Sequence, residues 1–151
     1  MSGAISDLTP LHAVLGHWRT SGQVLDEHGQ VVVEIGGTDT YTLLPGGTWI
    51  AHDVDVAMGE HHRALTHEVI GGEHAEGGWQ MVAFETAPRP NTMRLTLEEP
   101  GLLLVHGVGV RSWLRTDHGT DQMCARWERQ VEGEWLSWMD LTFDRLAPPE
   151  R

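Results

Sequence analysis

Three side chains on neighbouring predicted strands could do chemistry together: Asp39, His52 and His67. Adjacent strands lie about 4.7 to 4.9 Å apart, so a carboxylate and two imidazoles in a row across them can form a hydrogen-bonded chain. The carboxylate would orient the first ring, and an imidazole titrates near neutral pH. Such a row predicts either a polar contact for a ligand or a general acid/base, with His52 and His67 as the candidate catalytic groups. A purely structural polar row is the alternative, since buried ionisable groups destabilise a fold unless they are compensated.

The segment from Thr48 to Ile70 would position the two histidines as one β-hairpin. Apolar residues and His52 alternate with acidic residues in the first arm, which gives one buried and one solvated face. In the second arm His67 shares its face with leucine and valine. A two-residue turn at Gly59-Glu60, of type II′, would place His52 opposite His67 on the buried face.

The preceding hairpin would add the carboxylate. A four-residue loop over residues 44–47 pairs Tyr41 with Ile50 and Asp39 with His52. The prediction therefore depends on two loop lengths, and a slipped register would move Asp39 into solvent.

The rest of the chain is typical of an all-β protein. Residues 8–15 resemble a short helical turn, and after Gly16 short runs with period two are separated by turn residues at the spacing of a barrel or sandwich. Because no later stretch has a sustained helical period, we expect antiparallel pairing within one domain spanning residues 1–151. Nine or ten strands are expected, some of the following runs being merged: 17–25, 31–35, 38–44, 48–57, 62–70, 79–86, 92–98, 102–106, 110–116, 121–131 and 135–145.

The last hairpin allows one interior face to be followed in detail. A three-residue loop over residues 132–134 would place Trp127 opposite Met139 and Met123 opposite Phe143, which gives a continuous apolar wall. Cys124 would then point outward, away from any activating base.

Composition and charge limit the classes of partner. A formal charge of −12 disfavours nucleic acid and anionic membrane surfaces as partners. One cysteine excludes an internal disulfide, and no run of about 18 apolar residues occurs. We therefore expect a cytoplasmic protein that is neither secreted nor membrane-spanning. The composition leaves the oligomeric state open.

Gly16-His17-Trp18 at the start of the first strand and Arg145 on the last resemble the calycin arrangement of lipocalins. There a tryptophan closes one barrel end and an arginine packs across its ring. The segments LLPGGTWIAHDVDVAMG and ARWERQVEGEWLSWMDLTF resemble bacterial lipocalin-like domains of unknown function. The resemblance covers most of residues 11–146. It implies an up-and-down β-barrel of about ten strands around a pocket, and it transfers no catalytic residue.

The predicted function is binding of a small, mainly apolar molecule inside this barrel. Seven Trp and six Met, many on predicted inward faces, suit an adaptable apolar cavity or simply a core. The candidate ligand-binding residues are Asp39, Tyr41, His52, His67, Met81, Trp127 and Met139.

Two other functions remain open. One is an isomerase or cyclase that uses His52 or His67 as general acid/base on a natural product. The other is a haem- or metal-binding barrel, although the sequence has no established metal-ligand spacing and we expect neither a metal nor a cofactor. The chain is distantly similar to nitrobindins, which hold haem through a histidine near the C-terminus. Because no histidine follows His118, that position is absent, and His52, His67 or His106 would have to replace it.

Overall fold

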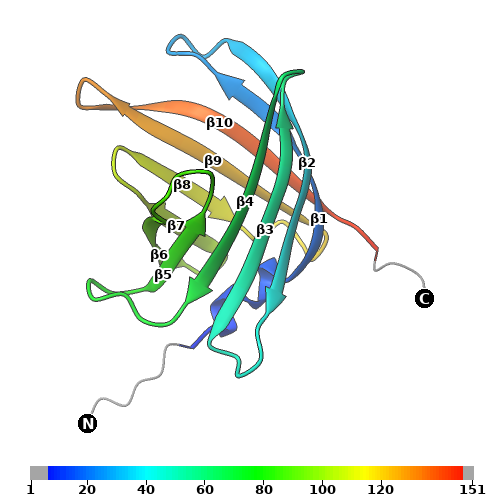
Figure 1. The fold of residues 1–151 in the computed structure, drawn as a ribbon, viewed down its shortest axis with the longest axis vertical. Helices are drawn as coiled ribbons and strands as arrows, with labels where there is room; N and C mark the ends of the chain where they lie inside the picture. The colour runs from blue at the N-terminus through cyan, green and yellow to red at the C-terminus, as the bar shows by residue number, and fades with distance from the viewer. Residues whose placement is uncertain (1–6, 148–151) are drawn as a thin grey trace.

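The protein is a closed barrel of ten antiparallel strands, seen in a computed structural model that describes residues 7–147 (Figure 1). Each strand pairs with its neighbours in sequence, and β1 closes the barrel against β10. This confirms the predicted all-β, up-and-down architecture with a short helix before the first strand. The elements are η1 (Thr9–Val14), β1 (Gly16–Leu25), β2 (Val31–Leu43), β3 (Trp49–Met58), β4 (His62–Gly71), β5 (Trp79–Phe84), β6 (Asn91–Glu99), β7 (Leu102–His106), β8 (Val110–Arg115), β9 (Gln122–Val131) and β10 (Glu134–Arg145).

Strand β2 merges two of the predicted runs across Gly36-Gly37. Gly37 lies on the inside of this long strand, and a Cβ there would collide with the backbone of Asp55 on β3. Glycine therefore lets β2 and β3 approach closely where the strand coils around the barrel.

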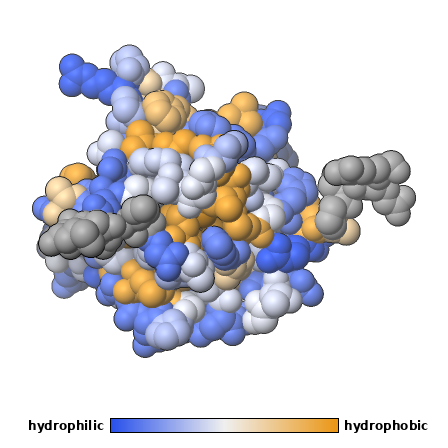
Figure 2. All heavy atoms as spheres, turned by 90° about the horizontal axis from the view of Figure 1, so that it is seen from below, coloured by the Kyte–Doolittle hydropathy of each residue, from blue (hydrophilic) through white to orange (hydrophobic). Residues whose placement is uncertain are grey.

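Alternation of side chains separates an apolar interior from a polar exterior. The main core cluster joins η1 to interior residues of nine strands, and a second cluster lies around Ile35, Val56 and Met139. On the face seen from below, apolar atoms gather at the centre and polar atoms surround them (Figure 2).

Helix η1 and Trp18 close one end of the barrel. The Trp18 side chain is fully buried, and its indole N–H donates a hydrogen bond to the carbonyl of Val14 (2.8 Å). The Arg145 guanidinium lies 4.2 Å from the centre of the Trp18 ring and also donates to the carbonyl of Leu15 (2.8 Å). The contact implied by the calycin resemblance is therefore present, and it ties the last strand to the first.

The last hairpin differs from the prediction at its tip but not along its length. The turn is Glu132-Gly133, both with positive φ (51° and 82°), so Glu134 pairs with Val131. The predicted three-residue loop is wrong. A bulge between Ser137 and Met139 then adds one residue to β10 and restores the predicted pairs from Trp127–Met139 inward.

In the β3–β4 hairpin, by contrast, the predicted pairing is wrong along the whole length of the strands. Its loop holds three residues rather than two, because Met58 pairs with His62, and His52 lies opposite Glu68. A shift of one residue turns every side chain of β4 to the other face. The predicted pairing of His52 with His67 is therefore wrong: Glu68 points inward and His67 outward.

The β2–β3 hairpin is shifted by two residues, which preserves the faces. Tyr41 pairs with His52, and Asp39 pairs with Val54. The predicted partners are wrong, but Asp39 and Tyr41 keep their interior positions. Within residues 7–147, no helix has both the length and the apolar character to span a membrane.

Candidate functional site

A cavity of about 410 Å³ occupies the barrel interior. Leu11 and Val14 of η1 line it at the closed end, and Met58, Glu85 and Trp138 line it towards the opposite end. Most of the side chains around it are aliphatic, methionine or aromatic. A space with these properties suits a small molecule with a large apolar surface.

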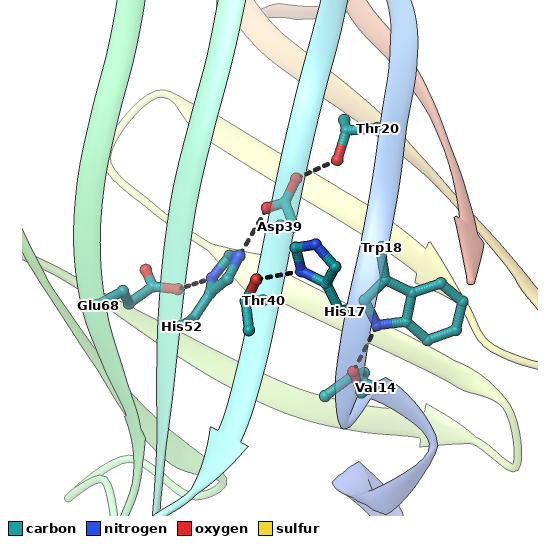
Figure 3. A network of polar contacts seen from close by, with 8 residues as sticks. All are labelled: Val14, His17, Trp18, Thr20, Asp39, Thr40, His52 and Glu68. Carbon is teal, nitrogen blue, oxygen red and sulfur yellow. Dashed lines mark hydrogen bonds and ion pairs between the residues drawn. The ribbon is translucent and has the colours of Figure 1, made fainter. Parts of the chain in front are cut away.

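One wall of the cavity carries a buried polar cluster that spans β1 to β4 (Figure 3). His52 lies between two carboxyl groups, with Nδ1 2.9 Å from Glu68 Oε1 and Nε2 2.7 Å from Asp39 Oδ1. The Thr20 hydroxyl donates to the other oxygen of Asp39. All four side chains are at least nine-tenths buried as residues.

Strand pairing explains how the cluster forms. Glu68 lies directly across from His52 on β4, and Asp39 lies diagonally across on β2, within reach of the far side of the ring. Tyr41 is directly opposite His52, and the two rings stack with centres 3.9 Å apart and planes 9° from parallel. The imidazole is therefore held on both edges and one face.

Charge at the site follows from this enclosure. Burial lowers the pKa of His52, but its hydrogen bonds and charge interactions with Asp39 and Glu68 outweigh burial and raise that pKa to about 9. The ring is thus an imidazolium at neutral pH, and it donates both N–H groups. Burial, and then the nearby carboxylates of Asp39 and Glu68, raise the pKa of Tyr41 well above its ordinary value, so the phenol stays protonated.

This arrangement limits the chemistry of His52. Because its pKa is raised, the ring at neutral pH has no free lone pair on either nitrogen, and each N–H points at a carboxyl oxygen. The ring does not suit a general base at neutral pH, and it does not fit an axial ligand for haem iron. What it provides is a fixed positive charge that holds two carboxyl groups in the cavity wall.

The other histidines considered as haem ligands lie outside the cavity. His67 is half-exposed and bonds Asp53 on the outer surface (2.6 Å). His106 lies on β7 next to the inward-facing Val105, and its Nε2 bonds the hydroxyl of Thr96 (2.8 Å). Among residues 7–147, no three or more His, Cys, Asp or Glu side chains are grouped so that they could hold a metal ion.

The structure places most of the predicted ligand-binding residues together. Six of the seven line the cavity, namely Asp39, Tyr41, His52, Met81, Trp127 and Met139. The seventh, His67, does not, because of the register shift. Two of the seven tryptophans, Trp113 and Trp135, pack against Arg111 on the outer surface and not in the interior.

Sequence reasoning missed five polar residues of the cavity: Thr20, Thr66, Glu68, Glu85 and Ser112. A period-two pattern that includes Glu68 is also present in β4: Ala64, Thr66, Glu68 and Ile70. The prediction places the alternate set, Leu65, His67 and Val69, on the buried face instead. Thr20 and Ser112 are small hydroxyl residues within ordinary strands, and nothing in the local pattern distinguishes them.

Three polar groups in the cavity wall have no hydrogen-bond partner among the described residues. They are the second carboxyl oxygen of Glu68, the hydroxyl of Tyr41 and the hydroxyl of Ser112. None of these atoms is completely enclosed, so a molecule in the cavity could reach them.

No protein-family model matches the chain, and no curated protein matches it significantly. Two solved structures are similar to it. One is a protein of unknown function of the DUF3598 family from Nostoc punctiforme (TM-score 0.60, 12% identity), where the match covers 97% of this chain and 54% of that one. This chain thus spans about half the length of that protein. The other is the S-type phycobiliprotein lyase CPES from Guillardia theta (TM-score 0.61, 13% identity), with 91% and 90% covered.

At such low identity these likenesses show the fold alone. They support the lipocalin-like barrel. The more distant similarity to nitrobindins stays a prediction.

Proposed function

We propose that this protein binds one small, mainly apolar molecule inside the barrel, with the cluster of Asp39, His52 and Glu68 orienting it. The observation that carries the proposal is the cavity of about 410 Å³, which has an apolar wall and one buried polar cluster. Binding sites for small molecules combine these two features: apolar surface supplies affinity, and a few fixed polar groups supply orientation.

The energetics of such a site are favourable. Each buried CH₂ group contributes about 0.8 kcal/mol, so a skeleton of eight carbons gains about 6 kcal/mol before the costs of association. The cluster itself needs little reorganisation, because Tyr41 and the two carboxyl groups already hold His52 in place. A preformed polar wall reduces the entropy that a ligand must lose on binding.

The fold of the second similar structure is compatible with this proposal, since that protein is a phycobiliprotein lyase built on the same kind of barrel. The likeness says nothing about the identity of the ligand here.

The neutral fluorophore N-phenyl-1-naphthylamine tests the proposal, because its emission rises in apolar surroundings. We expect saturable binding with one site per chain. Ala83→Phe would fill the cavity beside Glu68, since Ala83 is buried, lines the cavity and pairs with Glu68. This variant should bind the probe at least about tenfold more weakly, equivalent to about 1.4 kcal/mol.

Ala57→Phe is the matched control, because Ala57 is exposed and lies outside this cavity. It should bind the probe like the unmodified protein, and thermal unfolding would verify that both variants are folded. Absence of any saturable emission change, or equal losses in the two folded variants, would contradict binding inside the barrel.

A further inference from the structure

The polar cluster points to the class of ligand: we propose that the bound molecule is a cationic amphiphile, an apolar skeleton with one protonated amine that donates hydrogen bonds to Glu68. The inference rests on the proposed function, since it concerns the same cavity. It adds the sign of the ligand's charge and the position of the charged group.

The first argument is the inventory of charged groups around the cavity. Two buried carboxyl groups line it, those of Asp39 and Glu68, with the exposed Glu85 at its edge, against the single imidazole of His52. The chain contains no lysine, and none of the arginines in the described part of the chain lines the cavity. One positive ring does not balance two buried carboxyl groups, so the cavity favours a ligand that brings positive charge.

The second argument is that every donor of the cluster is used, whereas one carboxyl oxygen is not. Both N–H groups of His52 and the hydroxyl of Thr20 already bond the two buried carboxyl groups. The second oxygen of Glu68 has no partner within residues 7–147, although the residue is only 5% exposed. A buried carboxylate oxygen without a donor is unfavourable, and an ammonium group would supply that donor.

A neighbouring hydroxyl, that of Tyr41, is placed to help, because the Tyr41 ring stacks on His52, which bonds Glu68. Tyr41 and Ser112 are 8% and 2% exposed, line the cavity, and have no side-chain partner in the described part of the chain. The Tyr41 oxygen can accept a further N–H bond from the ammonium group, while Ser112, on β8, offers a polar contact on another part of the wall.

The third argument comes from the aromatic side chains of the lining. Trp127 and Trp138 both face the cavity and meet edge to face, with ring centres 6.4 Å apart. Indole faces attract cations and also suit an apolar skeleton. An anionic head group, such as a carboxylate, would instead meet the carboxyl groups and the negative faces of these rings.

Three probes with the same alkyl chain separate the possibilities: octylamine, octanol and octanoate, titrated into the unmodified protein by calorimetry at pH 7.5. We expect octylamine to bind at least about tenfold more tightly than octanol, and octanoate to bind most weakly. Equal binding of amine and alcohol, or tighter binding of octanoate, would overturn the inference and leave the proposed function intact. If neither these probes nor the naphthylamine fluorophore binds, the proposed function itself fails.

Glu68→Gln locates the charged group. Glutamine has nearly the same shape, so the variant should lose at least about tenfold in octylamine affinity while octanol binding stays unchanged. Glu99→Gln, on the exposed end of β6, is the matched control and should change neither affinity. Unchanged octylamine binding by a folded Glu68→Gln variant, judged by thermal unfolding, would show that the amine does not contact Glu68.

Discussion

His52 makes the stability of this protein depend on pH in a defined direction. The pKa of His52 is about 9 in the folded protein against an ordinary value of 6.5. The imidazolium therefore stabilises the folded state fully below pH 6.5, and this contribution is lost as the pH rises through 9. The difference between the two pKa values corresponds to about 3 kcal/mol, at about 1.4 kcal/mol for each pH unit.

The free energy of unfolding, measured by urea denaturation from pH 6 to pH 10, tests this value. Other groups also titrate in this range, so the informative quantity is the difference between the unmodified protein and His52→Gln. Glutamine cannot carry the charge, and the difference should shrink by about 3 kcal/mol between pH 6 and pH 10. His61→Gln is the control, because His61 lies in the exposed β3–β4 loop and its substitution should leave the free energy unchanged.

Two results would refute the reasoning. One is a difference between His52→Gln and the unmodified protein that is constant with pH or grows towards pH 10. The other is an NMR titration of the His52 ring with a midpoint at or below 6.5, which would mean that the ring is neutral at neutral pH.

Three further predictions concern the closed end of the barrel and Cys124. Trp18→Ala should lower the free energy of unfolding by about 3 to 5 kcal/mol, and Arg145→Ala should lower it by less. Because the guanidinium lies on the indole, a double-mutant cycle measured by urea denaturation should give a coupling energy of at least about 0.5 kcal/mol. Additive losses would contradict that contact. Gly16→Ala should destabilise the fold by about 1 to 3 kcal/mol, since its φ is 131° and a Cβ would collide with the Arg145 guanidinium. Gly29→Ala is its control, with positive φ but open space, and an equal loss there would remove the steric argument. Burial raises the pKa of the Cys124 thiol, so iodoacetamide should react more slowly with the native protein than with the urea-unfolded chain at pH 8; faster native labelling would be the opposite result.

The sequence by itself determined the fold class and much of the interior. Period-two runs and their turn residues predict the strands because each strand of a barrel has one buried face. The Gly-x-Trp start and Arg145 likewise predict the closed end, where the structure stacks the guanidinium on Trp18. The strand pattern can be predicted because it depends only on residues close together in the sequence. The contact at the closed end can be predicted because it depends on one pair of residues, Trp18 and Arg145.

Tertiary structure decided the composition of the polar cluster. The sequence places His52 and Asp39 inside because their strands have one plausible buried face each. On β4 two sets of alternating residues are both compatible with a buried face, one containing Glu68 and the other His67. The length of the loop after Met58, two residues or three, determines which set points inward. Glu68 then faces His52, and His67 and Leu65 (60% exposed) face solvent.

The physical reason is that a strand's register is an all-or-none property of the whole sheet, while the turn that sets it is only two or three residues long. A glycine at the start of the turn is compatible with both loop lengths. The inward position of Glu68 is compensated only because the closed barrel brings His52 and Asp39 together around one ring, and this arrangement exists only once all of these strands are paired.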